Sequence, residues 1–212
     1  MPAVAAFMMI SATASAAMYS NEPGRVELSG ARAAPAESPQ TVIQTATDQI
    51  RKIIGQYPQD PPARRQQIKA IVDGYFDFEA IARNAVGPRW RTLTSEERQT
   101  FTQEFSKLLF VNYIGDIERL AAQKITYNTR TIYQGYVVVE ASVSNQNSPV
   151  SVEYHLHLQD GNWKVYNVSA GGMSLVTNYR DQFDSILANG SFDQLSMMLK
   201  RQIARVCESN LC

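Results

Sequence analysis

The stretch that decides the fold is YVVVEASV at Tyr136–Val143, followed by VSVEYHLHL at Val150–Leu158. In both segments apolar residues alternate with mostly polar ones. A period of two predicts a β-strand with one face on a core and the other in water. We therefore expect two neighbouring strands of one sheet, with a dry face that needs a cover.

Two further segments extend this sheet. Residues 125–133 and 163–168 are rich in β-branched and aromatic residues, which favour strands. Gln134-Gly135 and Asp160-Gly161 have the composition of tight hairpin turns. The four segments therefore predict a twisted four-stranded antiparallel meander.

Most of the remaining chain has the spacing of helices. Ser38-Pro39 combines an N-cap residue with a proline at the first helical position. Thr94 and Glu97 form a capping box that opens the longest predicted helix, which runs to about Ala122. Its apolar residues recur every three or four positions, so we expect this helix to cover the sheet. The predicted fold class is α+β, with the sheet packed against a helical layer.

The inner face of the strand at Tyr136–Val143 carries mostly short side chains, valine and alanine. Under a curved helical cover, such a face leaves space. We therefore predict an enclosed apolar cavity, which is typical of exported proteins that carry lipids or other apolar ligands. Alternation and helical spacing predict these wall residues: Ile81, Phe101, Phe105, Leu108, Tyr113, Val137, Val139, Ala141, Val152, Tyr154, Leu156, Val165 and Val176.

The composition and the two ends of the chain limit the classes of protein to which it can belong. The chain has 212 residues, and its 20 basic side chains equal its 20 acidic ones, which argues against a nucleic-acid binder. We expect a secretory signal over residues 1–17, a flexible tail over 18–38, a single lipid-binding domain over 39–206 and a C-terminal tail over 207–212. The signal predicts export, although no basic residue precedes its apolar part.

Cysteine and histidine are scarce. Cys207 and Cys212 are the only cysteines, and the sequence leaves open whether they pair. No cysteine stands directly after the predicted cleavage region, so no lipid anchor is expected. His155 and His157 lie two apart on the outer strand face, and without further ligands they predict a solvated surface and no metal or cofactor site. Ser174 lacks the glycine at position 176 that a nucleophile elbow requires, so we expect it to cap a helix.

Two blocks of sequence carry a family pattern. The first is FDFEAIAR at Phe76–Arg83 with GPRWR at Gly87–Arg91, and the second is WKVY at Trp163–Tyr166 with NYR at Asn178–Arg180. In order and spacing they resemble the MlaC (toluene-tolerance, Ttg2) family, over about residues 40 to 204. The chain departs from the family pattern at two positions, Asn167 and Gly171, where acidic residues are usual.

The resemblance implies a soluble periplasmic phospholipid carrier and no enzymatic activity. Such a carrier would shuttle lipids between the outer and inner membranes as part of an ABC-type transport system that maintains outer-membrane lipid asymmetry. The implied partners are phospholipid as cargo, an outer-membrane lipoprotein–porin complex and an inner-membrane ABC transporter with an MCE-domain ring. Acyl chains would occupy the cavity, with the headgroup outside. Three arginines, Arg83, Arg89 and Arg91, would then lie near the mouth. They would either meet a phosphate, form solvated surface, or pair with Asp77 or Glu79.

Two alternatives stay open at this point. An enzyme of a cone-shaped α+β fold, acting on a small apolar substrate, would need an inward-facing carboxylate with a shifted pKa. Asp77 and Glu140 are the candidates, although alternation points Glu140 outward. An interaction module would instead have a solid core. Headgroup preference, the number of acyl chains and the direction of transport cannot be inferred from the sequence.

Overall fold

In the computed structural model, the described residues are 37–143 and 150–208. The predicted signal, nearly all of the predicted tail, the 145–148 connection and Cys212 lie outside them. The helices of the described part are α1 (Pro39–Gln56), α2 (Pro61–Tyr75), α3 (Phe78–Val86), the 3-10 helix η1 (Gly87–Thr92), α4 (Ser95–Ala121), α5 (Leu175–Asn189) and α6 (Phe192–Glu208). The strands are β1 (Ile125–Tyr133), β2 (Tyr136–Val143), β3 (Val150–Gln159), β4 (Asn162–Ala170) and β5 (Met173–Ser174).

The predicted helix starts are confirmed by their caps. The Ser38 hydroxyl accepts a hydrogen bond from the Thr41 backbone N–H, and proline follows at the first helical position. At the start of α4, Thr94 accepts from the Glu97 N–H while the Glu97 carboxylate accepts from the Thr94 N–H. Ser174 caps α5 in the same way. These bonds satisfy backbone donors that a helix leaves unpaired in its first turn.

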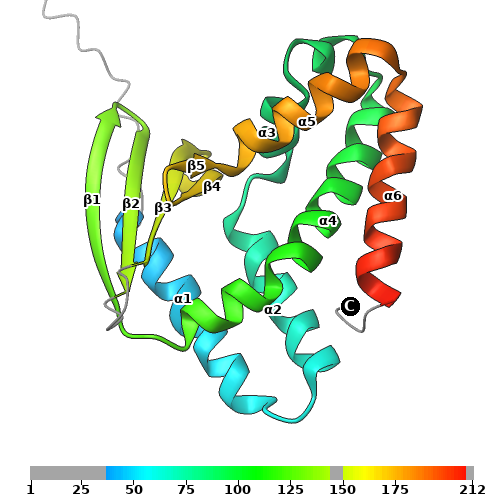
Figure 1. Ribbon diagram of the computed structural model, residues 1–212. Helices are drawn as coiled ribbons and strands as arrows, with labels where there is room; N and C mark the ends of the chain where they lie inside the picture. Colours follow the sequence, from blue (N-terminus) through cyan, green and yellow to red (C-terminus); the bar gives the residue numbers. More distant parts are fainter. Residues whose placement is uncertain (1–36, 144–149, 209–212) are drawn as a thin grey trace, which may run out of the picture. The chain divides into compact units, whose positions relative to one another are not determined.

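The sheet has the order β1-β2-β3-β4-β5, and every pair of neighbours is antiparallel. The α+β class and the antiparallel meander are therefore confirmed (Figure 1). The sheet differs from the prediction only by β5, a two-residue strand that pairs with the end of β4. Two residues are too few to give an alternating pattern, which is why the sequence does not indicate this strand.

A β-bulge interrupts the pairing of β3 with β4. His155 is paired with Asn167 and Leu156 with Val165, so Tyr166 is the extra residue. The bulge shifts the alternation in β4 by one position. As a result Val165 and Val168, three residues apart, are paired with Leu156 and Tyr154 on the same face of the sheet.

The helix that packs directly on the inner face of the sheet is α1, not α4. Val42 and Ile43 of α1 pack against Val137, Val139 and Leu156. The expectation that α4 covers the sheet was wrong for its N-terminal half, which packs against α3, α5 and α6 (Figure 1). A helix of 27 residues is long enough to meet different neighbours along its length.

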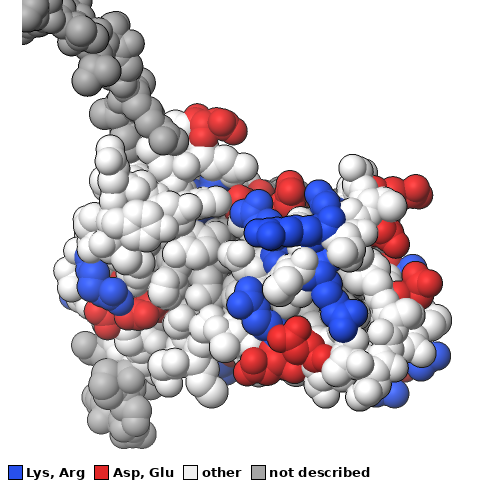
Figure 2. Space-filling view, turned by 90° about the horizontal axis from the view of Figure 1, so that it is seen from above, with Lys and Arg blue, Asp and Glu red and all other residues white. Residues whose placement is uncertain are grey.

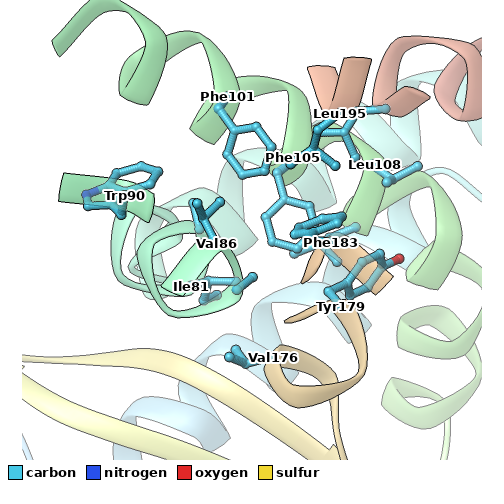
Figure 3. Packing of buried hydrophobic residues seen from close by; sticks show 14 of the residues in the cluster. Ile81, Val86, Trp90, Phe101, Phe105, Leu108, Val176, Tyr179, Phe183 and Leu195 are labelled. Atoms are coloured by element: carbon cyan, nitrogen blue, oxygen red, sulfur yellow. The ribbon is translucent and has the colours of Figure 1, made fainter. Parts of the chain in front are cut away.

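A filled core lies among α3, η1, α4, α5 and α6. Figure 3 shows rings and aliphatic side chains from these helices pointing toward one another. Phe101, Phe105 and Phe183 make ring contacts at 5.2–5.7 Å between centroids, largely edge-on or tilted. All three are almost completely buried. This cluster, which also includes Leu108, Val176 and Tyr179, is the filled core of the molecule.

The outer face of the sheet is less exposed than the alternation predicts. Val138 on this face is only 1% exposed. His155 lies 3.2 Å from the Ser169 hydroxyl, and both His155 and His157 contact the Tyr166 ring. The expectation of a solvated histidine pair was therefore wrong, because long neighbouring side chains cover this surface.

No helix in the described part is long and apolar enough to cross a membrane.

Candidate functional site

An apolar cavity of about 620 Å³ lies between the sheet and the helices. This volume is within the range of ligand pockets in proteins, roughly 300–1,000 Å³. Its walls come from β2 to β5 and from α1 to α5, and most of the side chains are aliphatic or aromatic. The lining residues are Thr47, Ile50, Val72, Phe76, Phe78, Ile81, Leu109, Phe110, Tyr113, Asp116, Ile117, Arg119, Leu120, Ala121, Gln123, Val143, Val150, Val152, Tyr154, Val168, Ala170, Met173, Ser174, Leu175 and Asn178.

Two exposed apolar residues mark where the cavity meets solvent. Met173 in β5 is 76% exposed and Val150 at the start of β3 is 49% exposed, yet both line the cavity. The charged side chains in the lining, Asp116 and Arg119, form an ion pair on the last turns of α4 and are themselves exposed. The interior is therefore apolar, and its rim combines exposed apolar residues with one ion pair, so an apolar chain can lie inside while a polar end stays in water.

The junction between α2 and α3, Phe76–Phe78, places two aromatic rings in the wall. The rings of Phe76 and Phe78 stack with centroids 5.6 Å apart. On the far side of this wall, the Lys69 ammonium lies over the rings of Phe78 and Phe110, at 5.6 and 5.9 Å from their centroids. The cation–π contacts tie α2 to the cavity wall.

Asp77, which lies between Phe76 and Phe78 in the sequence, anchors this junction to the sheet. Its backbone N–H donates to the Val165 carbonyl at 2.9 Å. One carboxylate oxygen accepts from the Ala80 N–H at 2.8 Å and so caps α3, while the other lies 3.0 Å from the His157 ring nitrogen. Asp77 and His157 are thus occupied in positioning the aromatic wall.

Burial shifts the phenol groups that face this region. The pKa of Tyr154 is raised well above its ordinary value, mainly by burial and further by nearby Tyr127. Burial also raises the pKa of Tyr113, and the adjacent Asp116 carboxylate adds to the shift. Both tyrosines therefore stay neutral over the physiological pH range.

Four of the thirteen predicted wall residues line the cavity. They are Ile81, Tyr113, Val152 and Tyr154. Each lies on a different part of the wall, on α3, on α4 and at two positions of β3. Their contact with a bound ligand stays a prediction.

The other nine predicted wall residues are buried elsewhere. Phe101, Phe105, Leu108 and Val176 belong to the filled core. Val137, Val139, Leu156 and Val165 lie in the cluster that α1 covers, and Ala141 is buried within the sheet. The physical reason is the same in each group: alternation and helical spacing identify apolar faces, but they do not identify which neighbour fills the space opposite.

The three predicted mouth arginines do not line the cavity. Arg83 on α3 and Arg89 and Arg91 on η1 are exposed, and none forms an ion pair with a described residue. Figure 2, which looks down on that end of the molecule, shows basic side chains gathered there.

Neither carboxylate of the enzyme alternative lines the cavity either. Glu140 accepts a hydrogen bond from the Ser151 hydroxyl at 2.6 Å on the outer face, and Asp77 has the roles given above.

Several lining residues were missed, for identifiable reasons. Val168 and Ala170 reach the cavity because of the bulge at Tyr166, which strict alternation cannot anticipate. Leu175 lines the cavity although its neighbour Val176 was selected. Ile117 and Leu120 carried a usable signal, since they continue the apolar spacing of α4 toward its C-terminus.

The departure from the family pattern at Asn167 leaves a polar network in place. Its side-chain oxygen accepts from the Ser174 hydroxyl at 3.1 Å and from the Val176 N–H at 3.2 Å. Both partners donate, so an amide oxygen serves here as a carboxylate would. Gly171 has a positive φ of 57°, a conformation that glycine adopts without strain. The turn into β5 and α5 is therefore consistent with both substitutions.

Comparisons with known proteins agree with this geometry. The family model described as MlaC protein matches residues 40–201. The chain is 27% identical over 164 residues to the toluene tolerance protein ttg2D of Pseudomonas putida, covering 74% of this chain and 76% of that protein. It is 21% identical over 178 residues to the intermembrane phospholipid transport system binding protein MlaC of Haemophilus influenzae, covering 79% and 83%.

A solved structure is similar over nearly its whole length. It is the phospholipid-binding protein of Ralstonia solanacearum in complex with a phospholipid, with a TM-score of 0.70 and 26% identity. The match covers 81% of this chain and 99% of that one. The likeness therefore includes both the sheet and the helices that form the cavity.

Proposed function

The chain belongs to the MlaC family, and on this premise we propose that it binds phospholipid and carries it through an aqueous compartment. The observation that carries the proposal is the apolar cavity of about 620 Å³, whose walls combine the sheet with five helices. The similar protein of Ralstonia solanacearum holds a phospholipid, which supports the same cargo here.

The energetics explain why such a carrier is needed. Moving one CH₂ group from an apolar environment into water costs about 0.8 kcal/mol. Two acyl chains with about 30 such groups would cost on the order of 25 kcal/mol by the same coefficient. A lipid therefore crosses water at a useful rate only inside an apolar container, and a wall built of hydrocarbon groups accepts chains of different length.

We propose more specifically that the protein is periplasmic and serves an ABC-type system that moves phospholipid between the two membranes and maintains outer-membrane asymmetry. Its partners would be an outer-membrane lipoprotein–porin complex and an inner-membrane ABC transporter with an MCE-domain ring. Support comes from the family resemblance and from the name of the Haemophilus influenzae relative. A purely binding role also suits a cavity that neither Asp77 nor Glu140 lines.

Lipid analysis tests the carrier function directly. The protein is purified without detergent, and its organic extract is analysed by mass spectrometry. We expect phospholipid in a constant ratio to protein. Val152→Trp, which places an indole in the cavity, should lose most of that lipid while the fold persists. The matched control is Ile132→Trp, which adds the same ring at an exposed strand position outside the cavity.

Two results would contradict the proposal. Extracts of the wild-type protein without phospholipid would remove its basis. Equal lipid content in Val152→Trp and Ile132→Trp, with both variants folded by circular dichroism, would show that any lipid is bound outside this cavity.

A further inference from the structure

A second cavity, the polar cleft, adjoins the apolar cavity. It has a volume of about 570 Å³ and lies where α1, the end of α4 and the start of β1 meet. Its lining residues are Gln44, Asp48, Arg51, Ala122, Gln123, Lys124, Ile125 and Tyr127. Gln123 lines both cavities, and Thr47 of the apolar cavity lies on α1 between Gln44 and Asp48 of the cleft.

The floor of the polar cleft is held by Arg51. Its guanidinium donates to the Ala121 carbonyl at 2.9 Å and to the Gln123 carbonyl at 3.2 Å, and it also forms an ion pair with Asp48. These bonds join α1 to the end of α4. They satisfy the carbonyl of Ala121, which the helix leaves unpaired, and that of Gln123 just beyond the helix. The cleft therefore has a fixed shape beside the last turn of α4.

The charge in the polar cleft is unbalanced. Arg51 and Lys124 contribute two positive charges and Asp48 one negative charge, which leaves a net charge of +1. Lys124 is exposed and forms no ion pair with a described residue. In the adjoining apolar cavity the charges of Asp116 and Arg119 cancel. A single phosphodiester, which carries one negative charge, would neutralise the cleft.

We propose that the polar cleft binds the phosphodiester of a phospholipid whose acyl chains occupy the apolar cavity, with Lys124 as the contacting cation. This inference rests on the proposed carrier function and adds a headgroup site to it. The shared residue Gln123 places the two halves of one amphipathic ligand side by side. Arg51 positions the cleft, and Lys124 supplies the charge that is still unpaired.

Binding of two matched lipids tests this assignment. The delipidated full-length protein is titrated with phosphatidylglycerol carrying a fluorescent acyl chain and with diacylglycerol carrying the same chains but no phosphate. We expect Lys124→Glu to weaken phosphatidylglycerol binding about tenfold, because an attractive charge becomes a repulsive one. Diacylglycerol binding should be unchanged. Lys52→Glu, an exposed neighbour outside the cleft, is the control for a general change of charge.

The outcomes separate this inference from the carrier function. If the wild-type protein binds both lipids but Lys124→Glu affects them equally or not at all, the headgroup site is wrong and the carrier function stands. If the wild-type protein binds neither lipid, the carrier function fails and the headgroup site fails with it. An equal loss in Lys52→Glu would show a surface charge effect and would also overturn the site.

Discussion

Two apolar interiors lie side by side in this molecule and share α4. The filled core around Phe101 and Phe105 is closed by rings from α4 and α5 at contact distance. A few turns later, Tyr113 and Ile117 of the same helix face a cavity of about 620 Å³. The side chains are of the same kind in both places. Whether an apolar face is filled or borders a cavity therefore depends on the element opposite it. Here α1 and the α2–α3 junction hold the sheet away from the C-terminal part of α4, and the cavity lies between them.

The largest effect should come from truncating a ring in the filled core. Phe101→Ala leaves a void among fixed neighbours and is expected to lower the free energy of unfolding by about 3–5 kcal/mol. Phe110→Ala enlarges a space that already exists and should cost about 1–2 kcal/mol, mainly through lost contacts. Urea denaturation followed by circular dichroism measures both. Equal costs would mean that the cavity wall is packed as tightly as the filled core.

Adding volume should give the same order, with the packed site again costing more than the cavity site. Val139 is completely buried beneath α1, so Val139→Trp overpacks the inner face and should cost about 1–3 kcal/mol or more. Val152 lies on the same face of the sheet, one inward position along β3 from the partner of Val139, and it lines the cavity. Val152→Trp should therefore lower the free energy of unfolding by less. Thermal unfolding of the two variants, compared with Ile132→Trp at the surface, measures the difference. A Val152→Trp variant that is the less stable of the two would show that the cavity has no room for an indole.

A smaller effect distinguishes Tyr179 in the filled core from Tyr154 at the cavity. In the filled core, the Tyr179 hydroxyl accepts a hydrogen bond from Asn112 at 3.1 Å, so Tyr179→Phe should cost about 1 kcal/mol at neutral pH. Tyr154→Phe at the cavity should be close to neutral there. Urea denaturation at pH 7 measures this comparison.

At alkaline pH, Tyr154→Phe should become more stable than the wild-type protein. Burial raises the pKa of Tyr154, so below the ordinary tyrosine value of about 10 it is protonated in both states and contributes no pH dependence. Above that pH the unfolded chain loses this proton first, and stability falls as pH rises. Tyr154→Phe should lose less stability than the wild-type protein between about pH 10 and 11. An identical loss would place the Tyr154 hydroxyl in contact with solvent.

The elements of the fold are predictable because their signals are local. Ser38-Pro39, the Thr94–Glu97 box and the Asp160-Gly161 turn act within a few residues, and the structure confirms each of them. The outer face of the sheet is less predictable. Alternation predicts that the His157 side chain faces solvent. In the structure the carboxylate of Asp77, 80 positions earlier in the chain, lies against it.

The candidate site follows the same division. Tyr113, Val152 and Tyr154 were placed correctly on apolar faces, and the cavity lies opposite them. Phe105 and Val139 were assigned to apolar faces just as correctly, yet other helices fill the space there. Nothing in their spacing separates the two cases, because spacing describes one element at a time.

The amino-acid sequence alone specifies the helices, the meander, the apolar faces and the family pattern at Phe76–Arg83, since each depends on neighbouring residues. Tertiary packing alone decides that α1 covers the sheet, that a bulge at Tyr166 brings Val168 inward and that the end of α4 lines an open space. The reason is that a cavity is a property of the distance between elements. That distance is set by contacts such as those of Asp77 and Arg51, which join residues 70 or more positions apart.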